Sequence, residues 1–75
     1  MSDDPLHAAV NATIAGHPEQ VRRWTRNLPG AWGYLAAKGI LAYKQQLGRA
    51  LSEAERRALW AALWESLSAE RSNHS

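Results

Sequence analysis

The sequence predicts an all-α protein, a small four-helix bundle with two short N-terminal helices and a long C-terminal helical hairpin. Apolar residues recur at intervals of three and four over most of the chain, and no run alternates with period two for long enough to form a strand. Proline and glycine divide the chain into four such segments. The 75 residues include no cysteine, so one small domain must be stabilised by helix packing or by self-association.

The first helix is expected to begin at Pro5. Asp4 before it is typical of an acidic N-cap that precedes a proline at the first helical position. Gly16 is expected to end the helix. Between these points, an apolar stripe at helical spacing is formed by Leu6, Ala9, Val10, Thr13 and Ile14.

The second helix is expected to be short and to open at His17 and Pro18 by the same proline rule. It should stop near Asn27, because Pro29 disfavours helical geometry at the residue before it and Gly30 offers a break. Opposite its apolar side lies a basic ridge, which consists of Arg22, Arg23 and Arg26.

The third helix is expected to run from about Ala31 to Leu47 and to end at Gly48, and it has the clearest apolar periodicity of the chain. It contains two interior glycines, Gly33 and Gly39. Each costs about 1 kcal/mol relative to alanine in a helix, so we expect close packing against a neighbouring helix to explain them.

The fourth helix is expected to begin at a capping box, in which Glu55 follows Ser52 at a distance of three residues, and to end near Ala69 or Glu70. Residues 1–70 then form a single domain and residues 71–75 a frayed tail. The third and fourth helices should form an antiparallel hairpin, with the two shorter helices on one side. The predicted core comprises Leu6, Val10, Ile14, Val21, Trp24, Leu28, Trp32, Leu35, Gly39, Ile40, Tyr43, Leu47, Leu59, Leu63 and Leu67.

Positive charge is concentrated in the middle of the chain. The net charge is only +2, yet residues 21–50 contain six Lys or Arg and no acidic residue. This distribution suits an anionic partner, and it equally suits a solvated face or an acidic first helix lying near a basic second one. The candidate residues for an anionic partner are the ridge and the cations that follow it: Arg22, Arg23, Arg26, Lys38, Lys44 and Arg49.

Four tryptophans are difficult to enclose in a monomer of this size, because each buries on the order of 150–250 Å² and its indole N–H needs a partner when buried. We therefore expect a surface that contacts a second copy or another protein. Its candidate residues are Trp60, Trp64, Leu67, Tyr34 and Leu41. Arg56 is expected to lay its guanidinium on the Trp60 indole, four residues away, unless it meets a carboxylate or phosphate instead.

Catalytic chemistry is not indicated. His7, His17 and His74 match no metal-ligand spacing, so no metal site and no cofactor are expected. Ser52 is already assigned as a helix cap, and the glycines match no phosphate-binding motif. We infer no enzyme activity and no small-molecule substrate.

The predicted function is a non-enzymatic protein-interaction module, an adaptor, regulator or accessory subunit that self-associates, with a homodimer favoured. The alternative is a nucleic-acid-binding protein that uses the ridge at residues 22–26 and the nearby cations to grip phosphates. The third class, attachment to a membrane surface, is disfavoured because the fourth helix balances its arginines with glutamates. A cytoplasmic location is expected, because no basic, apolar signal peptide opens the chain.

Overall fold

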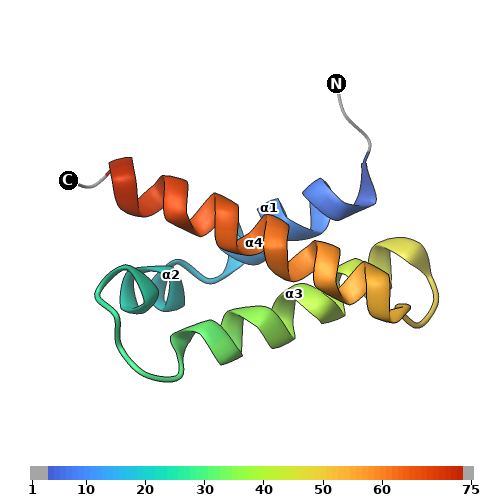
Figure 1. Ribbon diagram of the computed structural model, residues 1–75, viewed down its shortest axis with the longest axis horizontal. Helices are drawn as coiled ribbons and strands as arrows, with labels where there is room; N and C mark the ends of the chain where they lie inside the picture. Colours follow the sequence, from blue (N-terminus) through green and yellow to red (C-terminus); the bar gives the residue numbers. More distant parts are fainter. Residues whose placement is uncertain (1–3, 74–75) are drawn as a thin grey trace.

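The computed structural model describes residues 4–73, and the side chains of residues 4–70. Its helices are α1 (Pro5–Gly16), α2 (Pro18–Thr25), α3 (Ala31–Leu47) and α4 (Glu53–Asn73), and the described residues include no strand. The predicted all-α, four-helix fold is therefore confirmed (Figure 1).

Two helix starts follow directly from local sequence. At the start of α1, the Asp4 carboxylate accepts a hydrogen bond of 3.0 Å from the Leu6 backbone N–H. Before α4, the Glu55 backbone N–H donates to the Ser52 hydroxyl at 3.1 Å, while the Ser52 N–H donates to the Glu55 carboxylate at 2.8 Å. This reciprocal pair is the predicted capping box.

Two helix ends differ from the prediction. α2 ends at Thr25, two residues early, because Asn27 adopts the left-handed conformation with φ of 58°. The Leu28 N–H then donates to the Arg23 carbonyl and the Asn27 N–H to the Trp24 carbonyl, both at 3.0 Å, which is a Schellman closure. At the other end of the chain, α4 continues to Asn73, beyond the predicted stop near Glu70. Positions 74–75 of the predicted tail lie outside the described residues.

The helices pack around α3. Figure 1 shows α3 and α4 running in opposite directions, as expected for the predicted hairpin, with their connection at one end of the molecule and α2 at the other. The most extensive helix pairing is between α1 and α3, rather than within the hairpin. α1 therefore packs against α3 more extensively than α4 does, although the sequence predicted α1 only as one of two helices that lie on one side of the hairpin.

Leucines from α3 and α4 form the centre of the core. Leu35, Leu59, Leu63 and Leu67 are fully buried, and Val10 and Thr13 of α1 join them. The Thr13 hydroxyl donates to the Ala9 carbonyl at 2.8 Å, so this buried polar group is satisfied. Partly buried side chains from the predicted core pack around this centre: Leu6, Ile14, Val21, Trp32, Ile40 and Leu47.

One predicted core residue is wrong, since Leu28 is 45% exposed. The Schellman closure places it on the turn after α2, outside the helix whose apolar side it was expected to extend. Three small residues outside the predicted core, Ala9, Ala31 and Ala36, are buried instead of exposed.

The two interior glycines of α3 have different surroundings. A Cβ atom added at Gly39 would lie 3.5 Å from methyl groups of both Leu59 and Leu63, so this glycine faces α4 closely. A Cβ added at Gly33 would meet no atom within 4 Å. The expected packing reason therefore holds for Gly39, whereas no packing among the described residues accounts for Gly33.

Candidate interaction surfaces

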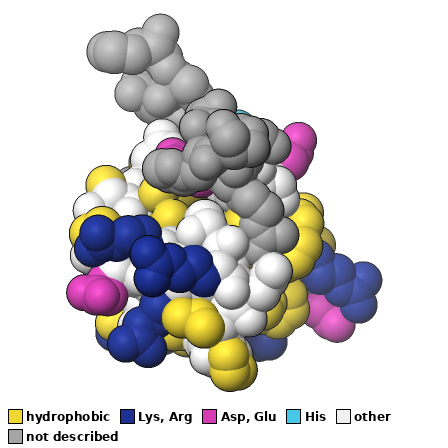
Figure 2. All heavy atoms as spheres, turned by 90° about the vertical axis from the view of Figure 1, so that its left-hand side faces the viewer, with side chains coloured by type: hydrophobic (Ala, Val, Ile, Leu, Met, Phe, Trp, Pro, Cys, Tyr) yellow, Lys and Arg dark blue, Asp and Glu magenta, His cyan; other side chains and the backbone are white. Residues whose placement is uncertain are grey.

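The arginines of α2 converge on one hollow of the surface. Arg22, Arg23 and Arg26 are exposed and, together with Glu19 and Leu28, line a depression of about 470 Å³, which we call the arginine hollow. Figure 2 faces the end of the molecule where α2 lies and shows basic side chains gathered beside hydrophobic ones, with an acidic group at the edge. The predicted ridge is thus a concave basic surface.

The cations of the arginine hollow differ from Arg49 and Arg57 in having no carboxylate partner among the described residues, even though Glu19 lines the same hollow. Arg49, by contrast, binds both oxygens of the Glu55 carboxylate at 2.8 and 2.6 Å. Arg57 binds Glu53 at 3.0 Å, which is the i, i+4 pairing that the helix geometry favours.

The remaining predicted cations do not join the arginine hollow. Arg49 lies in the connection between α3 and α4 and is neutralised by Glu55. Lys44 is exposed in the last turn of α3. Lys38 places its ammonium 5.4 Å from the centre of the Tyr34 ring, a cation–π contact. The positive charges of the middle third are therefore distributed over separate parts of the surface.

Three tryptophans that are distant in sequence meet in space. The Trp64 ring contacts Trp24 edge-to-face at 5.2 Å and Trp32 at 5.3 Å between ring centres. We call these three residues the tryptophan cluster. It joins α2, α3 and α4, and such aromatic pairs contribute about 0.5–1.5 kcal/mol beyond the area they bury. Trp24 is buried, whereas Trp64 remains 51% exposed.

A second hollow, of about 330 Å³, lies at the turn between α2 and α3 beside the tryptophan cluster. We call it the turn pocket. Its left-handed residues, Asn27 and Gly30, fix the path of the backbone. Leu28 lines both this pocket and the arginine hollow, so the two are adjacent. The turn pocket is lined by Trp24, Asn27, Leu28, Pro29, Gly30, Trp32 and Trp64.

The predicted partner-contact residues divide into three groups. Trp60 and Trp64 are exposed on α4, Trp60 by 37%. Tyr34 and Leu41 are exposed on α3, on the side opposite Trp32 at about 100° per residue. Leu67 is fully buried in the core, because it packs inward with Leu59 and Leu63, and so it is not available to a partner in this fold.

The expected contact between Arg56 and Trp60 is absent. Among the described side chains, Lys38 makes a cation–π contact with Tyr34, whereas Arg56 is exposed and makes none. Positions i and i+4 are neighbours on a helix, so the spacing permits this contact, but the side chains of Arg56 and Trp60 do not make it.

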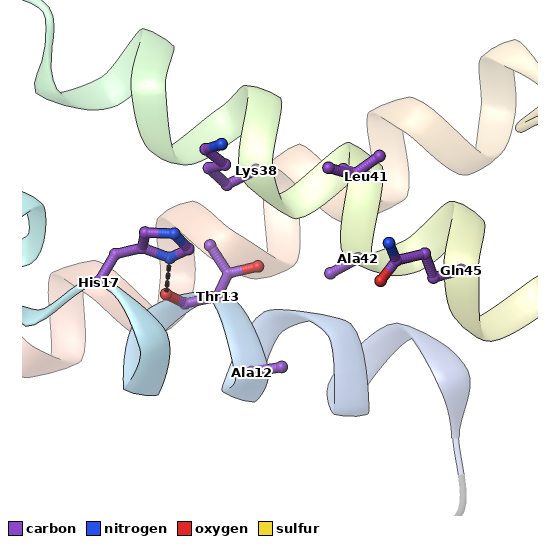
Figure 3. A pocket seen from close by; sticks show the side chains of 7 residues that line it. All are labelled: Ala12, Thr13, His17, Lys38, Leu41, Ala42 and Gln45. Atoms are coloured by element: carbon purple, nitrogen blue, oxygen red, sulfur yellow. Dashed lines mark hydrogen bonds between the residues drawn. The ribbon is translucent and has the colours of Figure 1, made fainter.

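A groove between α1 and α3 gathers polar side chains but no catalytic pair (Figure 3). The His17 ring bonds the Thr13 carbonyl through Nδ1 at 2.9 Å, which makes Nδ1 the donor. The Thr13 hydroxyl is itself bonded to the Ala9 carbonyl. Neither group is directed at the other, so the residues lining the groove contain no nucleophile held by a base.

The Arg49–Glu55 pair gives the fold a dependence on pH. The guanidinium of Arg49, with the Ser52 backbone N–H, lowers the pKa of Glu55 from 4.5 to about 2. Because the pKa is lower in the folded chain, this carboxylate stabilises the fold above pH 4.5, and its contribution is lost as the pH falls toward 2.

We therefore expect Glu55→Gln, which keeps the size of the side chain, to remove part of the stability at neutral pH and to reduce the loss on acidification. Thermal unfolding of the native and variant chains at a series of pH values would measure this. Arg49→Gln should act in the same direction, since it removes the donor. A constant difference between native and Glu55→Gln chains across this range would contradict the assignment.

Comparisons with protein-family models, with curated proteins and with solved structures found no match to this chain. Over the part of the chain that the structure describes, no helix has the length and apolar character needed to cross a membrane. No three His, Asp or Glu side chains in that part are grouped so that they could hold a metal ion. The geometry of the exposed surfaces is accordingly the basis for assigning a function.

Proposed function

We propose that this chain is a non-enzymatic helical protein-interaction module that self-associates through one face of α4. The observation that carries the proposal is the exposure of two tryptophans on adjacent turns of that helix, by 37% at Trp60 and 51% at Trp64. Covering the exposed part of one such ring contributes on the order of 2 kcal/mol at about 25 cal/mol per Å². Tryptophan is also enriched at the centres of protein interfaces.

The spacing along α4 favours a second copy as the partner. Glu53, Arg57, Trp60 and Trp64 are all exposed and follow one another at intervals of four, three and four residues, which is the spacing of a coiled-coil seam. We call this set the α4 face. It combines one acidic, one basic and two aromatic side chains, so two copies of it do not repel each other through net charge.

An antiparallel arrangement of two α4 helices uses these side chains best. It places Arg57 of one copy beside Trp60 of the other, where a cation–π contact forms. It also places Glu53 of one copy beside Trp64 of the other, so the indole N–H can donate a hydrogen bond to the carboxylate. A parallel arrangement instead opposes Glu53 to Glu53 and Arg57 to Arg57, which is unfavourable. The dimer we propose is therefore two-fold symmetric with antiparallel α4 helices.

The test is the mass of the chain in solution. We expect concentration-dependent dimers by analytical ultracentrifugation at micromolar to millimolar concentrations. Trp60→Glu should weaken the dimer at least tenfold, about 1.4 kcal/mol, because it removes the indole that the interface would cover, and because the desolvation of the new carboxylate is repaid only in part by an ion pair with Arg57 of the other copy. Far-UV circular dichroism should remain helical, since Trp60 is not one of the buried residues of the core.

Ala58→Glu is the matched control. It adds the same charge at an exposed residue that lies about 160° around α4 from Trp60 at 100° per residue, so it should leave the dimer unchanged. A native chain that stays monomeric at millimolar concentration, or an Ala58→Glu chain that dissociates as readily as Trp60→Glu, would contradict the proposal.

A further inference from the structure

We propose that the arginine hollow and the turn pocket together form a docking surface for an acidic peptide segment that carries a bulky apolar side chain. The carboxylates of the segment would bind Arg22 and Arg26, and its apolar side chain would pack on Leu28 at the mouth of the turn pocket. This surface lies on α2 and on the turn after it, and it is a second contact surface beyond self-association through the α4 face.

The first argument is charge. Three guanidinium groups are held within five consecutive residues, with no carboxylate partner among the described residues. Arg22 and Arg26 are like charges at i and i+4, an arrangement that destabilises an isolated helix. Two cations in the last turn of α2 complement the helix dipole, but Arg26 lies beyond that turn and adds repulsion. An acidic ligand removes this repulsion.

The second argument is the apolar surface that continues from these charges. Leu28 is 45% exposed and lines both hollows, so an apolar side chain that contacts it also reaches the turn pocket. The backbone there is held by the Schellman bonds and by the left-handed Asn27 and Gly30. A surface that is already ordered loses little conformational freedom when a ligand binds.

The third argument is distance. Arg22 lies in the last turn of α2 and Arg26 is the C-cap residue, whose N–H still donates to the Arg22 carbonyl at 3.2 Å. Four residues at this point correspond to about 6 Å along the helix axis at 1.5 Å per residue. Acidic residues four apart on a ligand helix, or two apart on an extended ligand at about 3.3 Å per residue, have the same spacing. Two carboxylates of one short segment can therefore meet both guanidinium groups at once, and bidentate pairing makes such contacts strong.

The distribution of charge favours a peptide over a nucleic acid. A nucleic-acid strand needs a basic stripe that follows several phosphates. Here Glu19 lines the hollow, Arg49 is paired with Glu55, and Lys38 is placed over Tyr34 on the other side of α3. The positive surface is thus compact and partly apolar, which fits a short acidic segment.

Fluorescence anisotropy with synthetic probes tests the proposal. The main probe is a fluorescein-labelled peptide of about a dozen residues with several glutamates around one phenylalanine, long enough for a linear recognition segment. Three comparison probes replace the glutamates by glutamine, replace the phenylalanine by serine, or consist of a single-stranded oligonucleotide of equal charge. We expect saturable binding of the main probe that weakens with salt, and at least tenfold weaker binding of each comparison probe.

Variants locate the binding on the protein. The pair Arg22→Glu with Arg26→Glu should abolish binding of the main probe, and Leu28→Ser should weaken it at least fivefold. The pair Lys44→Glu with Arg56→Glu is the matched control: both residues are exposed, and it changes the net charge equally. Lys44 lies in the last turn of α3 and Arg56 in the first turn of α4, and neither lines the arginine hollow or the turn pocket. That control should bind the main probe as the native chain does at moderate salt.

The two surfaces share Trp64, so each measurement is repeated on the monomeric Trp60→Glu chain. Binding of the acidic peptide to that chain supports the proposal independently of self-association. If the native chain forms dimers but does not bind the peptide, the proposed dimer through the α4 face stands and this inference is overturned. The inference is overturned if the main probe does not bind, if the glutamine probe binds equally, if the control pair loses binding as well, or if the oligonucleotide binds more tightly than the acidic peptide.

Discussion

Replacing Leu63 by alanine is expected to lower the free energy of unfolding by about 3 kcal/mol, within the range of about 2–5 kcal/mol for buried leucines. Leu63 is fully buried at the centre of α4, and its methyl group packs closely on the α3 backbone at Gly39, so its removal leaves a cavity inside a close contact between the two helices. A domain of this size has a total stability of about 5–10 kcal/mol, so this change removes a large share.

A second substitution makes this prediction specific. In Gly39→Ala the new methyl would lie 3.5 Å from the Leu63 side chain, so in a Leu63→Ala chain it points toward the space left empty. We expect the double variant to be more stable than the sum of the two single changes by about 0.5–1 kcal/mol. Urea denaturation of the four chains measures this coupling.

Leu41→Ala is the matched control, because the same atoms are removed from a leucine that is 48% exposed. Its cost should stay within about 0.5 kcal/mol. Strict additivity of the Leu63 and Gly39 changes, or a Leu41→Ala cost equal to that of Leu63→Ala, would show that the α3–α4 contact is not as described.

The second large effect is expected at Trp24. Trp24→Ala should cost about 3–5 kcal/mol, because this ring is the one buried side chain of α2 and holds that helix to Trp64 on α4. Since α2 has only eight residues, it is too short to persist without its packing. We therefore expect amide hydrogen exchange to accelerate first in α2 and in the turn after it, before α1, α3 and α4.

Trp60→Ala, measured at a concentration below dimer formation, is the comparison for this change. It removes the same side chain from an exposed site, so the loss of stability should be several-fold smaller. If the two substitutions cost the same, or if exchange in α2 stays as slow as in α3, the tryptophan cluster does not anchor α2.

Local signals in the sequence predicted the helices well. Proline at the first position, the Asp4 cap and the Ser52–Glu55 box act within a few residues, so their effect can be read without the fold. The end of α2 could not be placed this way. Pro29 and Gly30 gave the stronger stop signal, while the actual stop depends on Asn27 adopting a left-handed conformation that asparagine tolerates without requiring it. Leu28 was misplaced for the same reason.

Which residues form the candidate surfaces depends on tertiary contacts, and the spacing of residues along the sequence does not reveal these contacts. The ridge of Arg22, Arg23 and Arg26 was visible because its residues lie within five consecutive positions. The pair of Arg49 and Glu55 joins a connection to a helix, and the contacts of Trp24, Trp32 and Trp64 join three helices, so periodicity within one helix gives no indication of either. Leu67 illustrates the same limit: its place in an apolar stripe fits the core and an interface equally well, and only the packing of α4 decides between them.

The junction between α1 and α2 consists of a single residue. His17 closes one helix and opens the next, with φ of −136° and ψ of 59°. Its ring bonds the Thr13 carbonyl and makes an edge-to-face contact with Tyr34 at 5.5 Å between ring centres. The two short helices are therefore joined by one residue with a fixed backbone conformation and without a flexible linker. Since α1 lies along α3, the orientation of α2 and of its arginines depends on the torsion angles of one histidine. The insertion or deletion of a residue at His17 would change the direction of α2 and so move the arginine hollow. The connection at residues 48–52 is longer and can accommodate such a change.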